Sequence, residues 1–214
     1  VTTDTQRQNI HFRLNWQTMA EIGYKAVAIA FSDLAASYAR PQAFFVNLGV
    51  PAYLAEHSIQ ELYQGIRRAL KPHGAVLGGG NISVSGELTL DLFAIGEGRA
   101  GIFPLRANAR PGDGVYVTGP VGLARAGLLC LQWGETGFPS LVERFKFPRA
   151  RFDAARVLAD QGVACAMDIS DGLAGDAAHI ARASDLSIAF ETDRFSVDQQ
   201  LAAFCDHYGL AAQQ

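Results

Sequence analysis

Acidic residues beside hydroxyl residues are the first candidates for chemistry in this sequence. Three groups adjoin otherwise apolar stretches: Asp4 between two threonines, Asp33 after Ser32, and Asp168-Ile169-Ser170-Asp171-Gly172. Mg²⁺ prefers oxygen ligands, so carboxylates converging from separate elements would form a magnesium site beside a bound phosphate. The competing interpretation is structural, because an Asp ahead of a helix is more often an N-cap than a metal ligand.

Two of these acids are harder to explain as helix caps. Asp33 lies inside a predicted helix among apolar and small neighbours, and a buried carboxylate needs a partner. Asp168 ends a predicted strand, at the edge of an α/β sheet where ligands usually bind. For these two residues we favour the functional interpretation.

Several other residues leave two interpretations open. The glycine clusters 78–80 and 119–122 do not continue into the GxGxxG or GxxxxGK[ST] pattern, so neither Rossmann-type nor P-loop nucleotide binding is indicated, and each cluster alone is more often a tight turn. Arg106 either pairs with a phosphate or is simply solvated. His11 either contacts a ligand or caps the end of a strand. No Gly-x-Ser-x-Gly motif is present, and no activated nucleophile is predicted.

Composition excludes some partners. The chain has 214 residues, 21 acidic against 18 basic side chains and a formal charge of -3, so it lacks the basic excess that nucleic-acid binding needs. Its longest apolar runs are far shorter than the roughly 18 to 20 residues of a membrane span. The three cysteines form no CxxC pair, which fits a reducing cytoplasm rather than a disulfide framework.

The first half of the chain has the hydrophobic periodicity of a βαβαββ unit. A Ser58-x-x-Glu61 capping box is expected to begin the second helix. The expected elements are an extended segment at 2–12, a helix at 19–38, a strand at 44–50, a helix from 58, a short strand at 75–77 running into the glycine turn, and a strand at 87–95.

The second half alternates expected strands with expected helices, so the whole chain is predicted to be α/β with mixed α+β character. The polar, turn-rich segment 105–114 is predicted to be a hinge between two domains, 1–108 and 109–214. The expected strands are 115–118, 163–169 and 186–190, and the expected helices are 123–133, 151–161, 176–183 and 197–208.

Read in order, the motifs resemble one family, the thiamine-monophosphate kinases. Each motif is weak alone, but the ordered set spans nearly the whole chain. The motifs are Thr2-Thr3-Asp4-Thr5 with His11-Phe12, Gly23-Tyr24-Lys25-Ala26, Ser32-Asp33-Leu34-Ala35-Ala36, Ala109-Arg110-Pro111-Gly112-Asp113, Val117-Thr118-Gly119, Pro148-Arg149, Asp168-Ile169-Ser170-Asp171-Gly172-Leu173 and Asp176-x-x-His179-Ile180.

The resemblance implies a two-domain, synthetase-like architecture shared with aminoimidazole ribonucleotide synthetase. Domain 1–108 would bind ATP and magnesium and dimerise through its strands. Domain 109–214 would be an α/β domain closing over ATP, shortened at its C-terminal end. The family's Gly-Asp-Asp segment would lie before Val1 and its Gly-Gly-Glu-Asp-Tyr segment beyond Gln214, so we expect a chain shortened at both ends or a divergent relative.

The activity that the resemblance implies is transfer of the terminal phosphoryl group of ATP to the phosphate of thiamine monophosphate, with several Mg²⁺ ions and no side-chain nucleophile. Such transfer depends on charge neutralisation and in-line positioning. The implied magnesium ligands are Thr3, Asp4, Asp33, Asn81, Asp168 and Asp171. The implied ATP contacts are Tyr63, Gly80, Asn81, Arg106 and Ser170, and the implied substrate contact is His11.

One position departs from the family pattern. The family usually has Gly-Gly-Asp-Thr where this chain has Gly79-Gly80-Asn81-Ile82, so a neutral amide replaces a carboxylate ligand. Two alternatives therefore stay open: a related ATP-dependent synthetase with another small substrate, and a non-catalytic nucleotide-binding relative.

Overall fold

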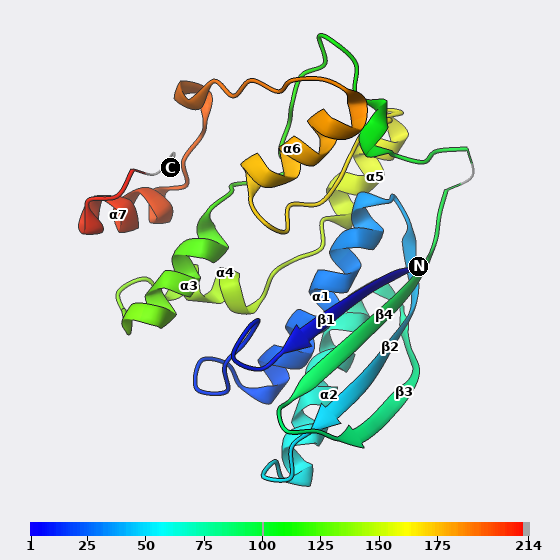
Figure 1. Cartoon of the computed structure of the whole chain (residues 1–214), viewed down its shortest axis with the longest axis vertical. Helices are drawn as coiled ribbons and strands as arrows, with labels where there is room; N and C mark the ends of the chain where they lie inside the picture. The colour runs from blue at the N-terminus through cyan, green and yellow to red at the C-terminus, as the bar shows by residue number, and fades with distance from the viewer. Residues whose placement is uncertain (100, 212–214) are drawn as a thin grey trace. The chain divides into compact units, whose positions relative to one another are not determined.

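The structure is a computed structural model that describes residues 1–99 and 101–211 (Figure 1). The chain divides into two compact units. The first comprises Val1–Phe103 with Phe147–Gln161, and the second comprises Pro104–Lys146 with Gly162–Gln214. The α/β fold class is confirmed. None of the helices in the described ranges is long and apolar enough to cross a membrane.

The first unit is a four-stranded sheet with helices on one face (Figure 1), and its element order confirms the predicted βαβαββ pattern. The strand order is β1-β4-β2-β3, with β4 antiparallel to both its neighbours and β2 parallel to β3. Its elements are β1 (Thr2–Arg7), α1 (Met19–Ala36), β2 (Arg40–Val50), α2 (Glu56–Leu70), η1 (Lys71–His73), β3 (Val76–Val84), β4 (Thr89–Glu97) and α5 (Phe152–Asp160).

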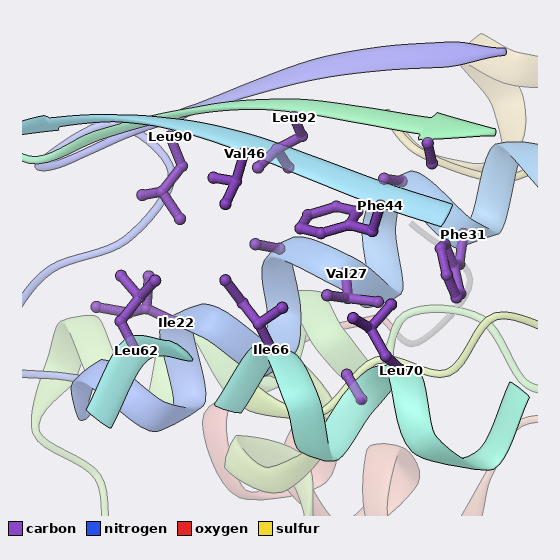
Figure 2. Packing of buried hydrophobic residues seen from close by; sticks show 14 of the residues in the cluster. Ile22, Val27, Phe31, Phe44, Val46, Leu62, Ile66, Leu70, Leu90 and Leu92 are labelled. Carbon is purple, nitrogen blue, oxygen red and sulfur yellow. The ribbon is translucent and has the colours of Figure 1, made fainter. Parts of the chain in front are cut away.

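Alternation along the strands gives the sheet one buried face and one open face. In β4, Leu90 and Leu92 are completely buried, while Asp91 between them is exposed. Figure 2 shows Leu90, Leu92 and Val46 pointing toward α1 and α2. Burying each such side chain contributes about 1.5–3 kcal/mol, so the core fixes which face of the sheet stays open.

Glycines bring α1 and α2 into close contact. A Cβ atom on Gly23 would lie 2.0 Å from the Leu62 carbonyl oxygen, and one on Gly65 would lie 1.9 Å from the Ala20 carbonyl oxygen. A capping box that the sequence analysis missed begins α1: Thr18 accepts from the Glu21 amide, and Glu21 accepts from the Thr18 amide.

Two local predictions in the first unit are wrong. The N-cap of α2 is Ala55, without a side-chain cap, so Ser58 lies within the first turn and forms no capping box. The glycine cluster 78–80 is no turn, because β3 runs through it. Gly80 is required there by close approach, since a Cβ atom would lie 1.8 Å from the Val46 carbonyl oxygen.

The regular structure of the second unit is helical. All four helices expected after residue 120 are present, although the helix expected at 151–161 belongs to the first unit. A small core of Leu123, Cys130, Leu141 and Phe204 joins three of the helices. Its elements are η2 (Arg106–Asn108), α3 (Leu123–Trp133), α4 (Pro139–Lys146), α6 (Leu173–Ser184), η3 (Thr192–Arg194) and α7 (Gln199–Tyr208).

The strands expected at 115–118, 163–169 and 186–190 are not formed, and no strand occurs among the described residues of the second unit. A strand requires a ladder of hydrogen bonds to a neighbour. The segment at 163–169 has separate bonds instead of a ladder, such as that from the Leu105 amide to the Ala164 carbonyl oxygen at 2.9 Å. An apolar pattern predicts an extended segment, but it does not supply a pairing partner.

Candidate functional site

A row of polar residues crosses the open face of the sheet in the first unit. Thr5 of β1 is paired with Asp91 of β4, Asp91 with Asn47 of β2, and Asn47 with Asn81 of β3. All four are exposed, and the Thr5 hydroxyl donates to Asp91 Oδ1 at 2.9 Å. The register therefore brings one oxygen-bearing side chain from every strand onto one line.

Part of this row borders a shallow depression of about 370 Å³. The predicted ligands Thr3 and Asp4 both border it. Thr3 shares the open face with Thr5 and Asp91, whereas Asp4 is paired with the buried Leu92, so its side chain lies on the opposite face. Asn47 and Asp91 are not among the site residues predicted from the sequence. The period-two alternation of β4 would place Asp91 on the open face, but only the strand register reveals its neighbours. The lining residues are Thr3, Asp4, Thr5, Asn47, Asp91, Leu92 and Phe93.

The side chain of Asp33 contacts β1 at Thr2, and neither residue lines the depression. It is half-buried near the end of α1, and its Oδ2 accepts a hydrogen bond from the Thr2 hydroxyl. The prediction that this carboxylate needs a partner is thus met by Thr2, which the sequence analysis did not assign. A hydroxyl that donates to one oxygen orients the carboxylate.

His11 is held at an exposed turn after β1. Its Nδ1 accepts from the Arg7 amide at 3.0 Å, and its own amide donates to the Arg7 carbonyl oxygen at 2.9 Å. The adjacent Phe12 is buried and anchors the turn. Because Nδ1 is an acceptor here, the proton of the neutral imidazole is on Nε2, which is then a hydrogen-bond donor.

Tyr63 lies apart from the polar row, on α2. It lines a groove of about 440 Å³ together with Ile59, Arg67 and Ile82. Partial burial raises the pKa of the Tyr63 phenol, so this group stays a neutral donor and acceptor near pH 7. The predicted ATP contact Gly80 is in β3 beside Asn81, where its close approach to Val46 already requires glycine.

The predicted ligands of the second unit share one loop before α6. The Ser170 hydroxyl donates to Asp168 Oδ2 at 2.8 Å. The amides of Ser170 and Asp171 both donate to Oδ2 of Asp176, at 2.9 and 3.1 Å. Asp176 is only 4% exposed. Asp176 lies within one of the motifs that resemble the family, but no role was predicted for it.

Arg106 is exposed in η2, and its backbone is anchored. The Arg106 carbonyl oxygen accepts from the Ser184 hydroxyl at 2.7 Å. Asn108 Nδ2 donates to the Ala164 carbonyl oxygen at 3.0 Å. The turn that carries the guanidinium is therefore fixed by bonds to α6 and to the segment before the Asp168 loop.

The donors fit a hard cation in their chemistry. Each predicted metal ligand offers a carboxylate, hydroxyl or amide oxygen, and Mg²⁺ takes one or two protein carboxylates while it keeps several waters. Within residues 1–99 and 101–211, no three His, Cys, Asp or Glu side chains are arranged to hold a metal among themselves.

Both halves of the chain match family models of known proteins. The family model described as AIR synthase related protein, N-terminal domain, matches residues 1–97, and the corresponding C-terminal domain model matches residues 110–211. The thiamine-monophosphate kinase of Aquifex aeolicus is 33% identical over 98% of this chain and 68% of that protein. That of Bacillus subtilis is 35% identical over 88% of this chain and 60% of that protein.

A solved structure, AaThiL complexed with AMPPCP and TMP, superposes with a TM-score of 0.92 at 31% identity. The match covers 99% of this chain and 69% of that one. The ordered motifs, the two domain matches and the identity to these kinases agree. The chain belongs to the thiamine-monophosphate kinase family.

Proposed function

We propose that this protein transfers the terminal phosphoryl group of ATP to the phosphate of thiamine monophosphate and forms thiamine diphosphate. The observation that carries the proposal is the 33% identity to a thiamine-monophosphate kinase over 98% of this chain. The adjacent positions of the proposed ligands Thr3 and Asp4 on β1, at the border of the depression that Asp91 also lines, support it.

Phosphoryl transfer requires positioning and charge neutralisation rather than a nucleophilic side chain. Donor and acceptor are both polyanions, and bound Mg²⁺ would neutralise their charges. In the first unit, Thr3, Asp4, Asp33 and Asn81 would hold magnesium. In the second, Asp168 and Asp171 would do so. Carboxylates that bind phosphates through Mg²⁺ also reconcile the formal charge of -3 with anionic substrates.

Hydrogen-bond donors would orient the two substrates. We assign the Nε2 proton of His11 to the phosphate of thiamine monophosphate, because the Arg7 amide occupies Nδ1. The Arg106 guanidinium would bind a phosphate of ATP, and the Ser170 hydroxyl would contact the nucleotide. Tyr63, Gly80 and Asn81 complete the proposed ATP contacts.

We further propose a homodimer formed through the strands of domain 1–108, as the resemblance to the family implies. β1 and β3 are the edge strands of the sheet, and an unpaired strand edge can pair with a second chain. Sedimentation at several protein concentrations tests the dimer, and a monomer at every concentration would contradict it.

The free state of Cys130, Cys165 and Cys205 supports a reducing, cytoplasmic location.

The role of Asp33 is tested by its conservative variant. We expect Asp33→Asn to reduce thiamine diphosphate formation from ATP and thiamine monophosphate by at least about tenfold. The matched control is Asp153→Asn, which removes an exposed charge paired with Arg151 and should keep wild-type turnover. Wild-type turnover in folded Asp33→Asn would refute the assigned role.

Asn81 favours one alternative, a non-catalytic nucleotide-binding relative. That alternative predicts calorimetric binding of an ATP analogue with Mg²⁺, no turnover, and no recovery in Asn81→Asp. The kinase proposal predicts turnover in the wild-type protein. A ribonucleotide that binds far more tightly than thiamine monophosphate would instead indicate a synthetase with another substrate.

A further inference from the structure

We propose that Asp176 is a positioning residue, which fixes the backbone of the loop at residues 168–172 and thereby the groups that meet ATP and magnesium. The inference rests on the proposed function, because that function gives Asp168, Ser170 and Asp171 their roles. Asp176 itself touches neither substrate nor metal in this proposal.

The burial of Asp176 is unusual in this chain. Among the residues whose side chains the structure describes, Asp176, at 4% exposure, is the only Asp, Glu, Lys or Arg that is buried. A buried carboxylate is costly unless hydrogen bonds satisfy it. Here a single oxygen, Oδ2, accepts the amides of Ser170 and Asp171 at 2.9 and 3.1 Å. Both bonds are charge-assisted and stronger than bonds between neutral groups.

The turn before α6 closes around this carboxylate. Gly172 has φ 109° and ψ 150°, a backbone conformation that residues other than glycine rarely adopt. Its carbonyl oxygen accepts the Asp176 amide at 3.0 Å. The carboxylate also lies in the first turn of α6, where the helix dipole favours negative charge. Asp176 therefore links the helix to the loop through both its backbone and its side chain.

The two amides that donate to Asp176 belong to Ser170 and Asp171, whose side chains are proposed to contact ATP and magnesium. Ser170 and Asp171 are exposed, and the Ser170 hydroxyl donates to Asp168 Oδ2 at 2.8 Å. With their backbone fixed, these side chains are held in place before ATP and magnesium bind. Partners of this kind, one step removed from a metal, typically change metal affinity or activity by 10- to 100-fold when they are mutated.

Asp176→Ala and Asp176→Asn test the inference, with Asp198→Ala as the matched control. Asp198 caps α7 by accepting the Gln200 amide at 2.9 Å, so its loss also removes a carboxylate-to-amide bond from the second unit, but at another helix. Two quantities are measured in folded protein: hydrogen exchange of the Ser170 and Asp171 amides without ligand, and calorimetric affinity for AMPPCP with Mg²⁺.

Asp176→Ala should speed exchange of both amides by about tenfold or more and weaken AMPPCP binding by about 10- to 100-fold. Asp176→Asn retains an acceptor oxygen and should recover most of the affinity. Asp198→Ala should lower thermal stability yet leave both quantities at wild-type values. Wild-type exchange and affinity in Asp176→Ala, or an equal loss of affinity in Asp198→Ala, would overturn the inference.

Failure of the proposed function has a different signature. If the wild-type protein binds AMPPCP but forms no thiamine diphosphate, the kinase proposal fails and the comparison of Asp176 with Asp198 still decides the positioning role. If the wild-type protein does not bind AMPPCP, exchange of the two amides decides it, and unchanged exchange in Asp176→Ala overturns the role.

Discussion

Asn81 is paired directly with Asn47 across the parallel strands β3 and β2. Two neutral amides are therefore adjacent on the open face of the sheet, and Asp91 follows next in the row. Where the family pattern has a carboxylate, this chain has an amide that offers a carbonyl oxygen without a charge.

Restoring the charge at this position should strengthen magnesium binding. We expect Asn81→Asp to lower the Mg²⁺ concentration needed for half-maximal turnover by roughly 2- to 5-fold, the magnitude of an exposed charge interaction. Titrating turnover with Mg²⁺ measures this. The control is Ser83→Asp, which adds the same charge to the same strand opposite Gly49. An equal shift in the control would show that only the general charge of the sheet matters.

His11 should act on thiamine monophosphate and not on ATP. A hydrogen bond to a charged group contributes about 1.5–3 kcal/mol, so His11→Ala should raise the KM for thiamine monophosphate by about tenfold or more and leave the KM for ATP unchanged. Steady-state kinetics with each substrate varied in turn measures both. His57→Ala on the exposed side of α2 should match the wild-type protein. An increase confined to the KM for ATP would disprove the assignment.

The close contact between α1 and α2 predicts a sensitive glycine. In Gly65→Ala the new Cβ would clash with the Ala20 carbonyl oxygen, so the helices must separate, and we expect a loss of about 1–3 kcal/mol in the free energy of unfolding. Urea unfolding of the first unit measures it. Gly86→Ala, where a Cβ would meet no atom within 4 Å, should change stability by less than about 0.5 kcal/mol. Equal stability of the two variants would contradict this packing.

The burial of Lys25 predicts that the stability of the protein depends on pH. Burial lowers its pKa from the ordinary 10.5 to about 8, so at pH 7 folding desolvates a charged amine. Between pH 8 and 10.5 the unfolded chain holds more protons, and this residue's contribution to stability rises with pH.

Lys25→Met removes the desolvation penalty. We expect it to stabilise the first unit at pH 7 by about 1–3 kcal/mol, with the advantage shrinking as the pH approaches 10.5. The difference between the two urea unfolding curves at each pH cancels the titration of other groups. An advantage that is constant or grows with pH would show that this pKa is not lowered in the folded protein.

Local patterns predicted much of the first unit and little of the site's internal arrangement. The alternation of β4 placed Leu90 and Asp91 on opposite faces, because side-chain direction in a strand follows from sequence alone. The neighbours of Asp91 depend on strand register, which no local pattern contains. Asp176 was missed for the same reason: its role comes from two amides of a loop that folds back onto it. The strands expected in the second half lacked pairing partners.

The direct test of the central claim is to incubate the protein with ATP labelled on its γ-phosphate, thiamine monophosphate and Mg²⁺, and to identify the labelled product. Phosphoryl transfer to the substrate phosphate predicts label in the terminal phosphate of thiamine diphosphate, with no transfer when Mg²⁺ is removed by a chelator. Label recovered only in inorganic phosphate, or remaining entirely in ATP, would contradict the assignment of this protein as a thiamine-monophosphate kinase.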